Sequence, residues 1–376
     1  MRGSLLIVSR FLAILAMGAL LVGCASSEKP KPSELEPNPS LLGIKQAWVN
    51  GLGTIGFALS VREFQGQIFL ASSDGMVAAI GADSGQDVWR TKLQSALVAG
   101  VGSDGRYAAV VSRDNEVILL DAGKELWRQK LGASTQTAPY VAGGRVFVLA
   151  GDRSIAAFDA ATGRKLWQQQ RAVDPLILGQ AGVIFGAGDT LVVGWGGRLV
   201  GLNSQSGTIR WDVPIANSRG TNEVERLVDL VAGVSRVGDV ACVRAFQSAV
   251  GCINVVKGSP IWSKPANGST GLHGDATTLF GTEGDGKLVA WNRADGERIW
   301  VNDRLRFRGL GAPLLVGRSV VVGDQAGLLH FFSREDGSLL QRIPTDNSPI
   351  AASPILVGQT LVVVTRLGKV LGFRPD

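Results

Sequence analysis

The chain has 376 residues, of which 50 are glycine, and a formal net charge of +6. The charge falls to +4 without the two arginines of the first ten residues, which is too little to indicate binding of nucleic acid. The many glycines are typical of an all-β fold with many turns. The length exceeds the usual size of one domain, so it favours a fold that grows by repetition rather than by enlarging one core.

Residues 1–23 are predicted to be a signal peptide. An apolar run of twelve residues, from Phe11 to Val22, follows a basic start. Such a run is too short to cross a bilayer comfortably and is typical of the core of a signal peptide. It ends in Leu21-Val-Gly-Cys24, which resembles the lipobox of bacterial lipoproteins. The resemblance implies that Cys24 is acylated and becomes the new N-terminus. An ordinary signal peptide with an incidental cysteine is the alternative.

Residues 24–40 are predicted to be the lipidated cysteine and a proline-rich tether. Ala25 and Ser26 lack the aspartate that resembles an inner-membrane retention signal, so we expect the lipid in the outer membrane, facing the periplasm. Two or more acyl chains suffice for stable anchoring. The four prolines and mixed charges cannot form a core. At about 3.1 Å per residue, the tether would hold the rest of the chain about 50 Å from the lipid.

One short motif repeats along the remaining residues, 41–376. Its fullest copy is Asp159-Ala-Ala-Thr-Gly163-Arg-Lys-Leu-Trp167, in which the glycine lies four residues before the tryptophan. A period near forty residues is typical of a propeller or a solenoid. The copies end at Trp48, Trp89, Trp127, Trp167, Trp211, Trp262, Trp300 and Gln341. The intervals between these residues are 41, 38, 40, 44, 51, 38 and 41 residues.

The residues around each motif predict about four short strands per repeat. Alternating apolar residues precede the motif, as in Ser154–Phe158 and Lys287–Trp291, and a second apolar stretch such as Arg145–Ala150 comes before them. Alternation with a period of two indicates half-buried strands. The Asp and Gly of the motif favour a turn, because Asp bonds its own downstream backbone and Gly accepts a positive φ. Each repeat is therefore predicted to be a propeller blade.

Counting the repeats predicts a closed ring. There are eight motif endings and eight strands of the kind that precedes a motif. The last such strand, Gly368–Phe373, has no motif after it, and the first ending, Trp48, has no such strand before it. Pairing these two removes the free edges of an open ring. The predicted fold is therefore an all-β, eight-bladed β-propeller of four-stranded antiparallel blades, closed by pairing the N- and C-terminal strands.

Seven of the nine tryptophans end a motif, and we predict a structural role for them. At the end of an outer strand, a tryptophan can lie flat between neighbouring blades, where an indole covers on the order of 150–250 Å². The alternative, an aromatic ligand cage, requires several rings on one surface, whereas these are distributed one per blade.

Two further groups leave alternatives open. Aligning the blades places Cys242 and Cys252 almost opposite each other on adjacent strands. They form either a disulfide, which an oxidising periplasm allows, or two buried thiols, since adjacent strands often have the wrong geometry for a bridge. Arg304, Arg306 and Arg308 alternate with apolar residues in one strand or rim loop. A solvated face is the favoured interpretation, and a contact with an acidic partner or a lipid headgroup is the alternative.

The repeat resembles the blade motif of quinoprotein alcohol and glucose dehydrogenases, which are eight-bladed periplasmic enzymes. That resemblance would imply adjacent cysteines, a calcium ion held by acidic side chains and an aspartate base over the quinone. The sequence has no adjacent cysteines and no acidic cluster in an insertion, and His273 and His330 lie in different blades. Because a fold does not carry a function, we predict no enzyme, no cofactor and no metal site. A quinoprotein dehydrogenase-like protein is the alternative.

The lipobox, the proline-rich tether and the eight short blades together resemble the BamB family, the propeller lipoproteins of the outer-membrane β-barrel assembly machine. The resemblance covers the whole chain. Asn222–Asp229 looks like an acidic–Arg-Leu-x-Asp segment of that family, and Asp174–Gly179 looks like its Leu-x-Leu-Arg loop. In the family, these two loops bind the periplasmic domains of the barrel insertase BamA. The resemblance therefore implies that partner role for Leu176, Leu178, Glu223, Arg226 and Asp229.

The same two loops stand out by length. The two longest repeat intervals, of 44 and 51 residues, contain Leu176–Leu178 and Glu223–Asp229. Extra length goes into loops, and loops on a rigid scaffold often carry binding. Two positions depart from the family pattern, because Gly179 replaces an arginine and Val231 replaces a frequent second aspartate. A core strand is the alternative interpretation of the two leucines.

The sequence thus predicts a non-enzymatic, lipid-anchored scaffold that aids insertion of outer-membrane proteins. Its expected partners are BamA, the rest of the assembly complex and outer-membrane lipid through Cys24. Its expected location is the periplasmic side of the outer membrane. An adaptor with another partner is a further alternative, and contact with unfolded barrel substrates through a strand edge is left open.

Overall fold

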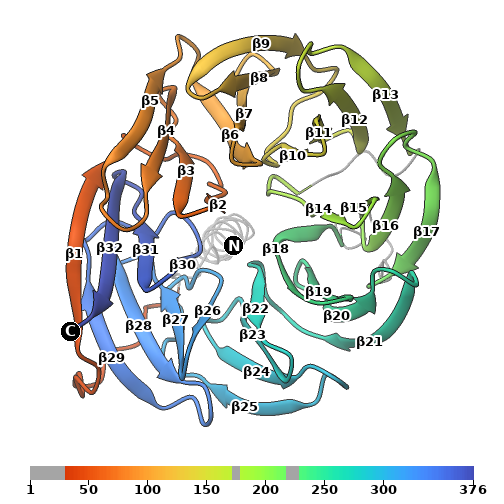
Figure 1. Ribbon diagram of the computed structural model, residues 1–376. Coiled ribbons are helices and arrows are strands. Elements are labelled where there is room, and N and C mark those ends of the chain that lie inside the picture. The colour runs from red at the N-terminus through yellow and green to blue at the C-terminus, as the bar shows by residue number, and fades with distance from the viewer. Residues whose placement is uncertain (1–29, 172–177, 217–227) are drawn as a thin grey trace, which may run out of the picture. The chain divides into compact units, whose positions relative to one another are not determined.

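The computed structural model describes residues 30–171, 178–216 and 228–376. All regular structure in these ranges is β-strand, in eight four-stranded antiparallel sheets. In the same ranges, no helix is long and apolar enough to cross a membrane. The sheets of the Ser33–Asp376 unit form a ring in which each sheet is one blade, with its first strand near the axis and its last strand at the rim (Figure 1). The predicted eight-bladed propeller is confirmed.

Blades 1 to 7 each use four consecutive strands. Blade 1 consists of β2 (Arg62–Phe64), β3 (Gln67–Ala71), β4 (Met76–Gly81) and β5 (Asp87–Lys92), and blade 2 of β6 (Leu97–Ser103), β7 (Tyr107–Ser112), β8 (Glu116–Asp121) and β9 (Lys124–Lys130). Blade 3 consists of β10 (Tyr140–Ala142), β11 (Arg145–Leu149), β12 (Ser154–Asp159) and β13 (Lys165–Gln170). Blade 4 consists of β14 (Ile184–Ala187), β15 (Thr190–Trp195), β16 (Arg198–Asn203) and β17 (Ile209–Pro214). Blade 5 consists of β18 (Leu230–Val237), β19 (Val240–Ala245), β20 (Ala249–Asn254) and β21 (Ser259–Pro265). Blade 6 consists of β22 (Leu272–Gly274), β23 (Thr278–Thr282), β24 (Leu288–Asn292) and β25 (Arg298–Asn302). Blade 7 consists of β26 (Leu314–Val316), β27 (Ser319–Gly323), β28 (Leu328–Ser333) and β29 (Leu339–Pro344).

Blade 8 is assembled from both ends of the chain. Its inner strands are β30 (Ile355–Val357), β31 (Thr360–Val364) and β32 (Lys369–Pro375), and its outer strand is β1 (Ile44–Gly51). β1 runs antiparallel to β32, with Ile44 opposite Pro375 and Gly51 opposite Lys369. The two strands lie side by side at the rim in Figure 1. This pairing confirms the predicted closure of the ring.

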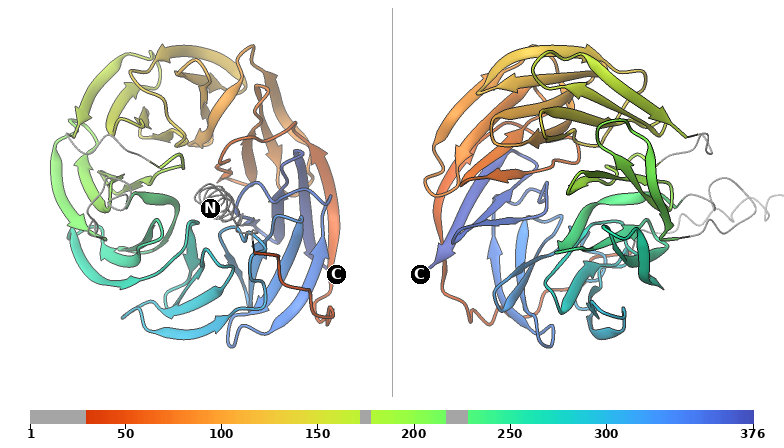
Figure 2. Two further views of the ribbon diagram at one scale, coloured as in Figure 1. Left: turned by 180° about the vertical axis from the view of Figure 1, so that it is seen from behind. Right: turned by 45° about the vertical axis from the view of Figure 1, so that its right-hand side comes forward.

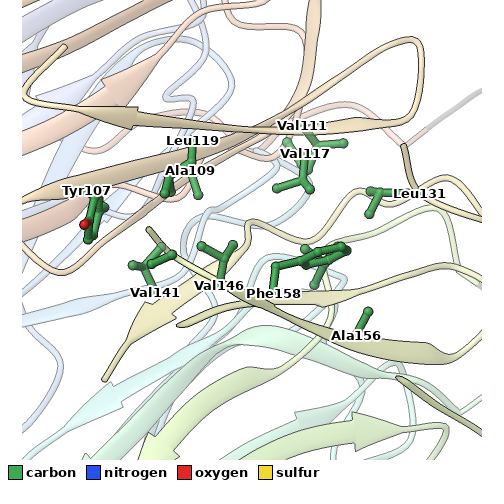
Figure 3. Packing of buried hydrophobic residues seen from close by; sticks show 13 residues of the cluster. Tyr107, Ala109, Val111, Val117, Leu119, Leu131, Val141, Val146, Ala156 and Phe158 are labelled. Carbon is green, nitrogen blue, oxygen red and sulfur yellow. The ribbon is translucent and has the colours of Figure 1, made fainter. Parts of the chain in front are cut away.

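The core lies between the blades because the middle strands carry apolar side chains on both faces. Every residue of β7 is buried, whereas the outer strand β9 has only exposed and half-buried residues. Figure 3 shows side chains of β7 and β8 above those of β10, β11 and β12, so that blades 2 and 3 share one apolar cluster. Its labelled members include Tyr107, Val111, Leu119, Val146 and Phe158.

Each motif tryptophan packs on the motif glycine of the next blade. A Cβ atom built on Gly163 would lie 2.8 Å from the ring of Trp127, so only glycine fits there. Gly163 also has φ +73°, which glycine adopts without strain. The indole Nε1–H of Trp127 donates to the carbonyl of Ala160 at 2.8 Å. The structural role predicted for these tryptophans is confirmed, and the pairs are Trp48 with Gly85, Trp89 with Gly123, Trp127 with Gly163, Trp167 with Gly207, Trp211 with Gly258, Trp262 with Gly296 and Trp300 with Gly337.

The exception at Gln341 has a physical reason. Gln341 occupies the tryptophan position of β29 in blade 7. The next blade has no motif turn, because its two outer strands, β32 and β1, come from opposite ends of the chain. A tryptophan at Gln341 would therefore have no motif glycine to cover.

The two ends of the blades differ in what they carry. Antiparallel alternation places the motif turns and the turns between first and second strands at one end. The turns between second and third strands and the connections between blades lie at the other end, which we call the loop face. Figure 2 shows the ring from behind and obliquely, with the strands of each blade running between these two ends.

Cys242 and Cys252 are joined by a disulfide in this structure. They lie directly opposite each other on β19 and β20, in the register expected from aligning the blades. Cys242 and Cys252 are both fully buried. The bond therefore links two strands of one blade and does not join two blades.

The three arginines near residue 306 lie in the connection between β25 and β26 rather than on a strand. The side chains of Arg304 and Arg306 are 61% and 45% exposed, which agrees with a solvated face, although they pair with Glu36 and Asp285. The favoured interpretation is wrong for Arg308. Its side chain is only 11% exposed, and its Nε lies 2.9 Å from the buried Oδ2 of Asp324.

Candidate partner-binding site

Two of the predicted partner residues, Leu178 and Asp229, are brought together on the loop face. Leu178 follows β13 in the connection from blade 3 to blade 4, and Asp229 precedes β18 in the connection from blade 4 to blade 5. The remaining predicted residues lie outside the described ranges, and they are Cys24, Leu176, Glu223 and Arg226.

Asp229 joins three segments that are far apart in sequence. Its Oδ2 accepts the backbone N–H of Leu178 at 3.0 Å. Its Oδ1 accepts a hydrogen bond from Nη2 of Arg153 at 3.0 Å. The side chains of Arg153 and Asp229 are 12% and 18% exposed, so this ion pair is screened less than a surface pair would be. The carboxylate therefore fixes the position of the Leu178 loop relative to the turn that carries Arg153.

Arg153 was not identified from the sequence, although the repeat contains a signal for it. It lies in the turn between β11 and β12 with φ +61°, a conformation that is uncommon for a residue other than glycine. Comparison of the turns shows an arginine where the other four-residue turns have glycine or asparagine. The corresponding residues are Gly75, Asn115, Gly286, Gly327 and Gly368. From this position the side chain of Arg153 reaches Asp229.

The Leu178 loop is held by backbone contacts on both sides. The N–H of Gly182 donates to Oγ1 of Thr137 at 2.9 Å, which links the loop to blade 3. Gly182 also forms an isolated β-bridge with Val231, and the N–H of Ala232 donates to the carbonyl of Ala181 at 2.8 Å, which links the loop to blade 5. The start of β14 is thus positioned by backbone contacts with both neighbours.

A hollow of about 100 Å³ lies between these segments. Its wall combines the hydroxyl of Thr135, the Arg153–Asp229 pair and the apolar side chain of Leu178. Glycines line much of the remainder, which lets another chain approach the backbone closely. Such a mixed, open hollow fits one or two side chains of a protein partner better than a whole small molecule, for which pockets of about 300–1,000 Å³ are usual.

The alternative interpretation of the leucines as a core strand is wrong for Leu178. This residue lies in a loop and is half-buried, outside any strand. Gly179, where the family has arginine, is exposed beside it. Val231, where the family often has a second aspartate, is buried in β18. The surface at this site therefore presents fewer charges than the family pattern would give.

The described part of the site holds an ion pair and hydroxyl groups. Asp229 is occupied by its two donors, and the hydroxyl of Thr135 donates to the carbonyl of Leu149 at 2.6 Å. Over residues 30–171, 178–216 and 228–376, no group of three or more His, Cys, Asp or Glu side chains is placed to hold a metal ion.

Comparison with known proteins identifies the family. A family described as "Outer membrane protein assembly factor BamB" matches residues 73–302. A protein of that name from Burkholderia pseudomallei is 37% identical over 379 residues, which cover 98% of this chain and 99% of the relative. The chain belongs to the BamB family. A BamB of Bordetella pertussis is 32% identical, with coverage of 96% of this chain and 95% of the relative.

Solved structures agree on the fold. The crystal structure of BamB from Moraxella catarrhalis matches with a TM-score of 0.80 and 22% identity, over 88% of this chain and 99% of that one. A quinohemoprotein alcohol dehydrogenase from Comamonas testosteroni matches with a TM-score of 0.68 and 16% identity, over 91% of this chain and 78% of that one. At these identities the matches show the propeller fold alone, so the dehydrogenase shares that fold with this BamB-family chain and indicates nothing about its function.

Proposed function

We propose that the chain is a non-enzymatic lipoprotein of the outer-membrane β-barrel assembly complex. In this proposal, Cys24 is acylated and anchors the propeller to the periplasmic leaflet of the outer membrane. The loop face around Arg153, Leu178 and Asp229 then binds the periplasmic domains of the insertase BamA. Leu176, Glu223 and Arg226 contribute to the same surface, because they belong to the same two connections.

The observation that carries the partner proposal is the double contact of Asp229. One carboxylate holds the Leu178 loop and the Arg153 turn next to a small hollow. The two connections that meet there are also the two long repeat intervals of the sequence. Chain length beyond that of a blade is therefore concentrated at one place on an otherwise regular ring. An apolar centre with a polar rim is the usual composition of a protein interface.

The decisive experiment combines Leu176→Ala with Leu178→Ala. We expect the double variant to lose co-purification with BamA from the native envelope, because the apolar anchors of the surface are removed. The unfolding free energy should change little, since Leu178 lies in a loop and is half-buried. Binding of the purified periplasmic domains of BamA, measured by calorimetry, would give the affinity directly.

A matched control is available in blade 6. Ile299 and Val301 are exposed aliphatic residues of the outer strand β25, 51% and 46% accessible. The double change Ile299→Ala with Val301→Ala removes a comparable apolar area and should leave BamA binding intact. Binding at wild-type affinity by the leucine variant, in a folded protein, would contradict the proposed surface.

The anchor is tested separately. Mass spectrometry of the mature protein should show an acylated Cys24 as the first residue. An unmodified thiol at that position, or retention of Met1, would contradict the lipid anchor without bearing on the partner site.

A further inference from the structure

A segment of the predicted tether is bound to blade 7. We call residues 33–42 the N-terminal strap. The strap begins at the connection between β25 and β26, where the N–H of Ser33 donates to the carbonyl of Arg306 at 2.9 Å. The hydroxyl of Ser33 donates to the carbonyl of Arg304 at 2.6 Å, and its own carbonyl accepts from Nη1 of Arg308 at 3.1 Å. The backbone N–H, the hydroxyl and the carbonyl of Ser33 therefore all have hydrogen-bond partners on the loop face.

The strap then runs antiparallel along the outer edge of β29. The N–H of Arg342 donates to Oδ1 of Asn38 at 2.8 Å, and Nδ2 of Asn38 donates to the carbonyl of Arg342 at 3.0 Å. Nη1 of Arg342 donates to the carbonyl of Glu36 at 3.0 Å, and the N–H of Leu41 donates to the carbonyl of Leu340 at 2.9 Å. Prolines at 37 and 39 remove two donors from the strap, as is common on edge strands.

Arg308 and Arg342, which bond to the strap, also form hydrogen bonds with buried side chains of blade 7. Asp324, which is buried, accepts from Nε of Arg308 at 2.9 Å and from Nε2 of His330 at 3.1 Å. Nδ1 of His330 accepts from Nε of Arg342 at 3.4 Å. The two guanidinium groups are therefore held by contacts other than those with the strap, which lowers the ordering cost of the contact.

The strap also lies where the ring is irregular. The junction of blades 7 and 8 has Gln341 in place of a tryptophan, and blade 8 has no motif turn. Leu42 and Ile44 pack there against the apolar cluster that the two blades share, as do Leu340 and Ile343. The chain that leads to β1 thus fills the junction that has no tryptophan–glycine contact.

We infer that the strap is a clamp that fixes the point at which the lipid tether leaves the propeller. This inference rests on the proposed acylation of Cys24. About nine residues separate Cys24 from Ser33, and they can span at most about 32 Å. Without the clamp, the tether would extend to Gly43, about nineteen residues, and could span about 68 Å. The clamp therefore halves the reach of the anchor.

The clamp also sets which face of the propeller is near the lipid. Ser33 is bound to a connection of the loop face, the same face that carries Arg153 and Asp229. A short tether from that point keeps the loop face closer to the bilayer than the motif-turn face. The partner site is thereby limited to a narrow range of heights and orientations above the membrane.

The test uses acylated full-length protein in phosphatidylethanolamine–phosphatidylglycerol vesicles that contain an acceptor lipid dye. Donor dyes are placed by Asp303→Cys, next to the exit point, and by Arg318→Cys, at the opposite end of blade 7, since both side chains are exposed. We expect more energy transfer from position 303 than from position 318. Glu36→Lys combined with Asn38→Ala should release the strap and abolish that difference. Glu34→Lys, an exposed site with the same charge change, should preserve it.

Amide exchange decides whether the clamp is closed in solution. The N–H groups of Ser33 and Leu41 should be protected in the unaltered protein and should lose that protection in the strap variant. Exchange at the rate of an unstructured peptide in the unaltered protein would overturn the clamp, as would equal energy transfer from both positions. If the protein fails to associate with vesicles, the lipid anchor is wrong, and amide exchange still decides the clamp. The strap variant should retain BamA binding in solution, which separates this test from that of the partner site.

Discussion

The junctions between blades and the proposed partner site are built from different kinds of contact. Seven junctions use the same contact, a tryptophan on the glycine of the next blade. The site on the loop face uses an ion pair, Arg153 with Asp229, between segments that are 76 residues apart. The junction contact recurs because each blade must bury the same apolar surface on its neighbour. The ion pair is tied to two long connections, which is the place where the chain departs from its repeat.

The comparison teaches how to separate stability from recognition in a repeat protein. A residue that occurs in every blade is expected to affect the free energy of unfolding. A residue that breaks the pattern, such as an arginine at a glycine position of a turn, is expected to affect binding. The predictions below test this separation, from the largest expected loss of stability to the smallest.

Trp127→Ala should cause the largest decrease in the free energy of unfolding. The change removes the ring that covers Gly163 and the hydrogen bond to Ala160. Loss of a fully buried tryptophan typically costs about 3–5 kcal/mol, which is the upper limit for this half-buried ring. Denaturant unfolding measures the loss, while BamA binding by the folded fraction should be unchanged. Gln341→Ala, at the equivalent position of blade 7, should change stability by less than about 0.5 kcal/mol. Equal costs for both changes would contradict the role of the contact.

Removal of the disulfide should come next. Cys242→Ala with Cys252→Ala opens a bridge of sequence separation 10, for which loop-closure entropy predicts a loss of about 3 kcal/mol. The bond lies within blade 5, so neither the junction contacts nor BamA binding should change. Unfolding under oxidising conditions measures the loss in the double variant. Addition of a reductant that opens the bond should bring the unaltered protein to the same midpoint. A midpoint that does not depend on reductant in the unaltered protein would show that the bond does not form.

Asp229→Ala should lower the free energy of unfolding by less than the changes above, but it should weaken BamA binding, which they leave unchanged. The change removes the acceptor for Arg153 and for the N–H of Leu178, and loss of a mostly buried acceptor costs about 1–3 kcal/mol. Release of the Leu178 loop should weaken BamA binding, measured by calorimetry. The control is Asp189→Ala, which removes the exposed ion pair with Arg210 and should cost about 0–1 kcal/mol without affecting binding. Intact binding in the Asp229 variant would separate this carboxylate from recognition.

The smallest effect concerns pH. Burial lowers the pKa of both histidines, His273 and His330, below their usual value. At pH values between the usual pKa of histidine and the lowered pKa, the unfolded chain binds more protons than the folded chain. The free energy of unfolding therefore falls as the pH falls. Each Nδ1 accepts a hydrogen bond, from Leu315 and Arg342 respectively, and protonation removes both acceptors. We expect the free energy of unfolding to decrease from pH 7 to pH 5. His273→Gln with His330→Gln should flatten this dependence, and an unchanged slope would contradict the assignment.

The fold could be predicted from local sequence because its determinants are local. The motif fixes a turn, a glycine with positive φ and an outer-strand tryptophan within nine residues, as in Asp159–Trp167. Repetition of that unit then determines the number of blades. The closure by β1 and β32 follows from the same count, because one strand and one motif ending are left without partners.

The contacts of the proposed partner site could be predicted only in part from the sequence. The lengths of two repeat intervals and the family resemblance pointed to Leu178 and Asp229, which the structure places together. Arg153 was missed because its contact with Asp229 crosses 76 residues, and no local pattern encodes a contact of that range. The burial of Arg308 was missed for the same reason, since its partner Asp324 belongs to the next blade.

The sequence by itself thus determined the blade, the number of blades and the order of the chain around the ring, since each rests on short-range turns and alternation. The tertiary structure decided which faces meet. It showed that the strap follows the edge of β29, that Asp229 holds two segments at once and that the Cys242–Cys252 pair is bonded. The first two features depend on the closed ring, which brings distant loops to one face and leaves one junction for the N-terminal segment to fill. The disulfide depends on the register of two adjacent strands.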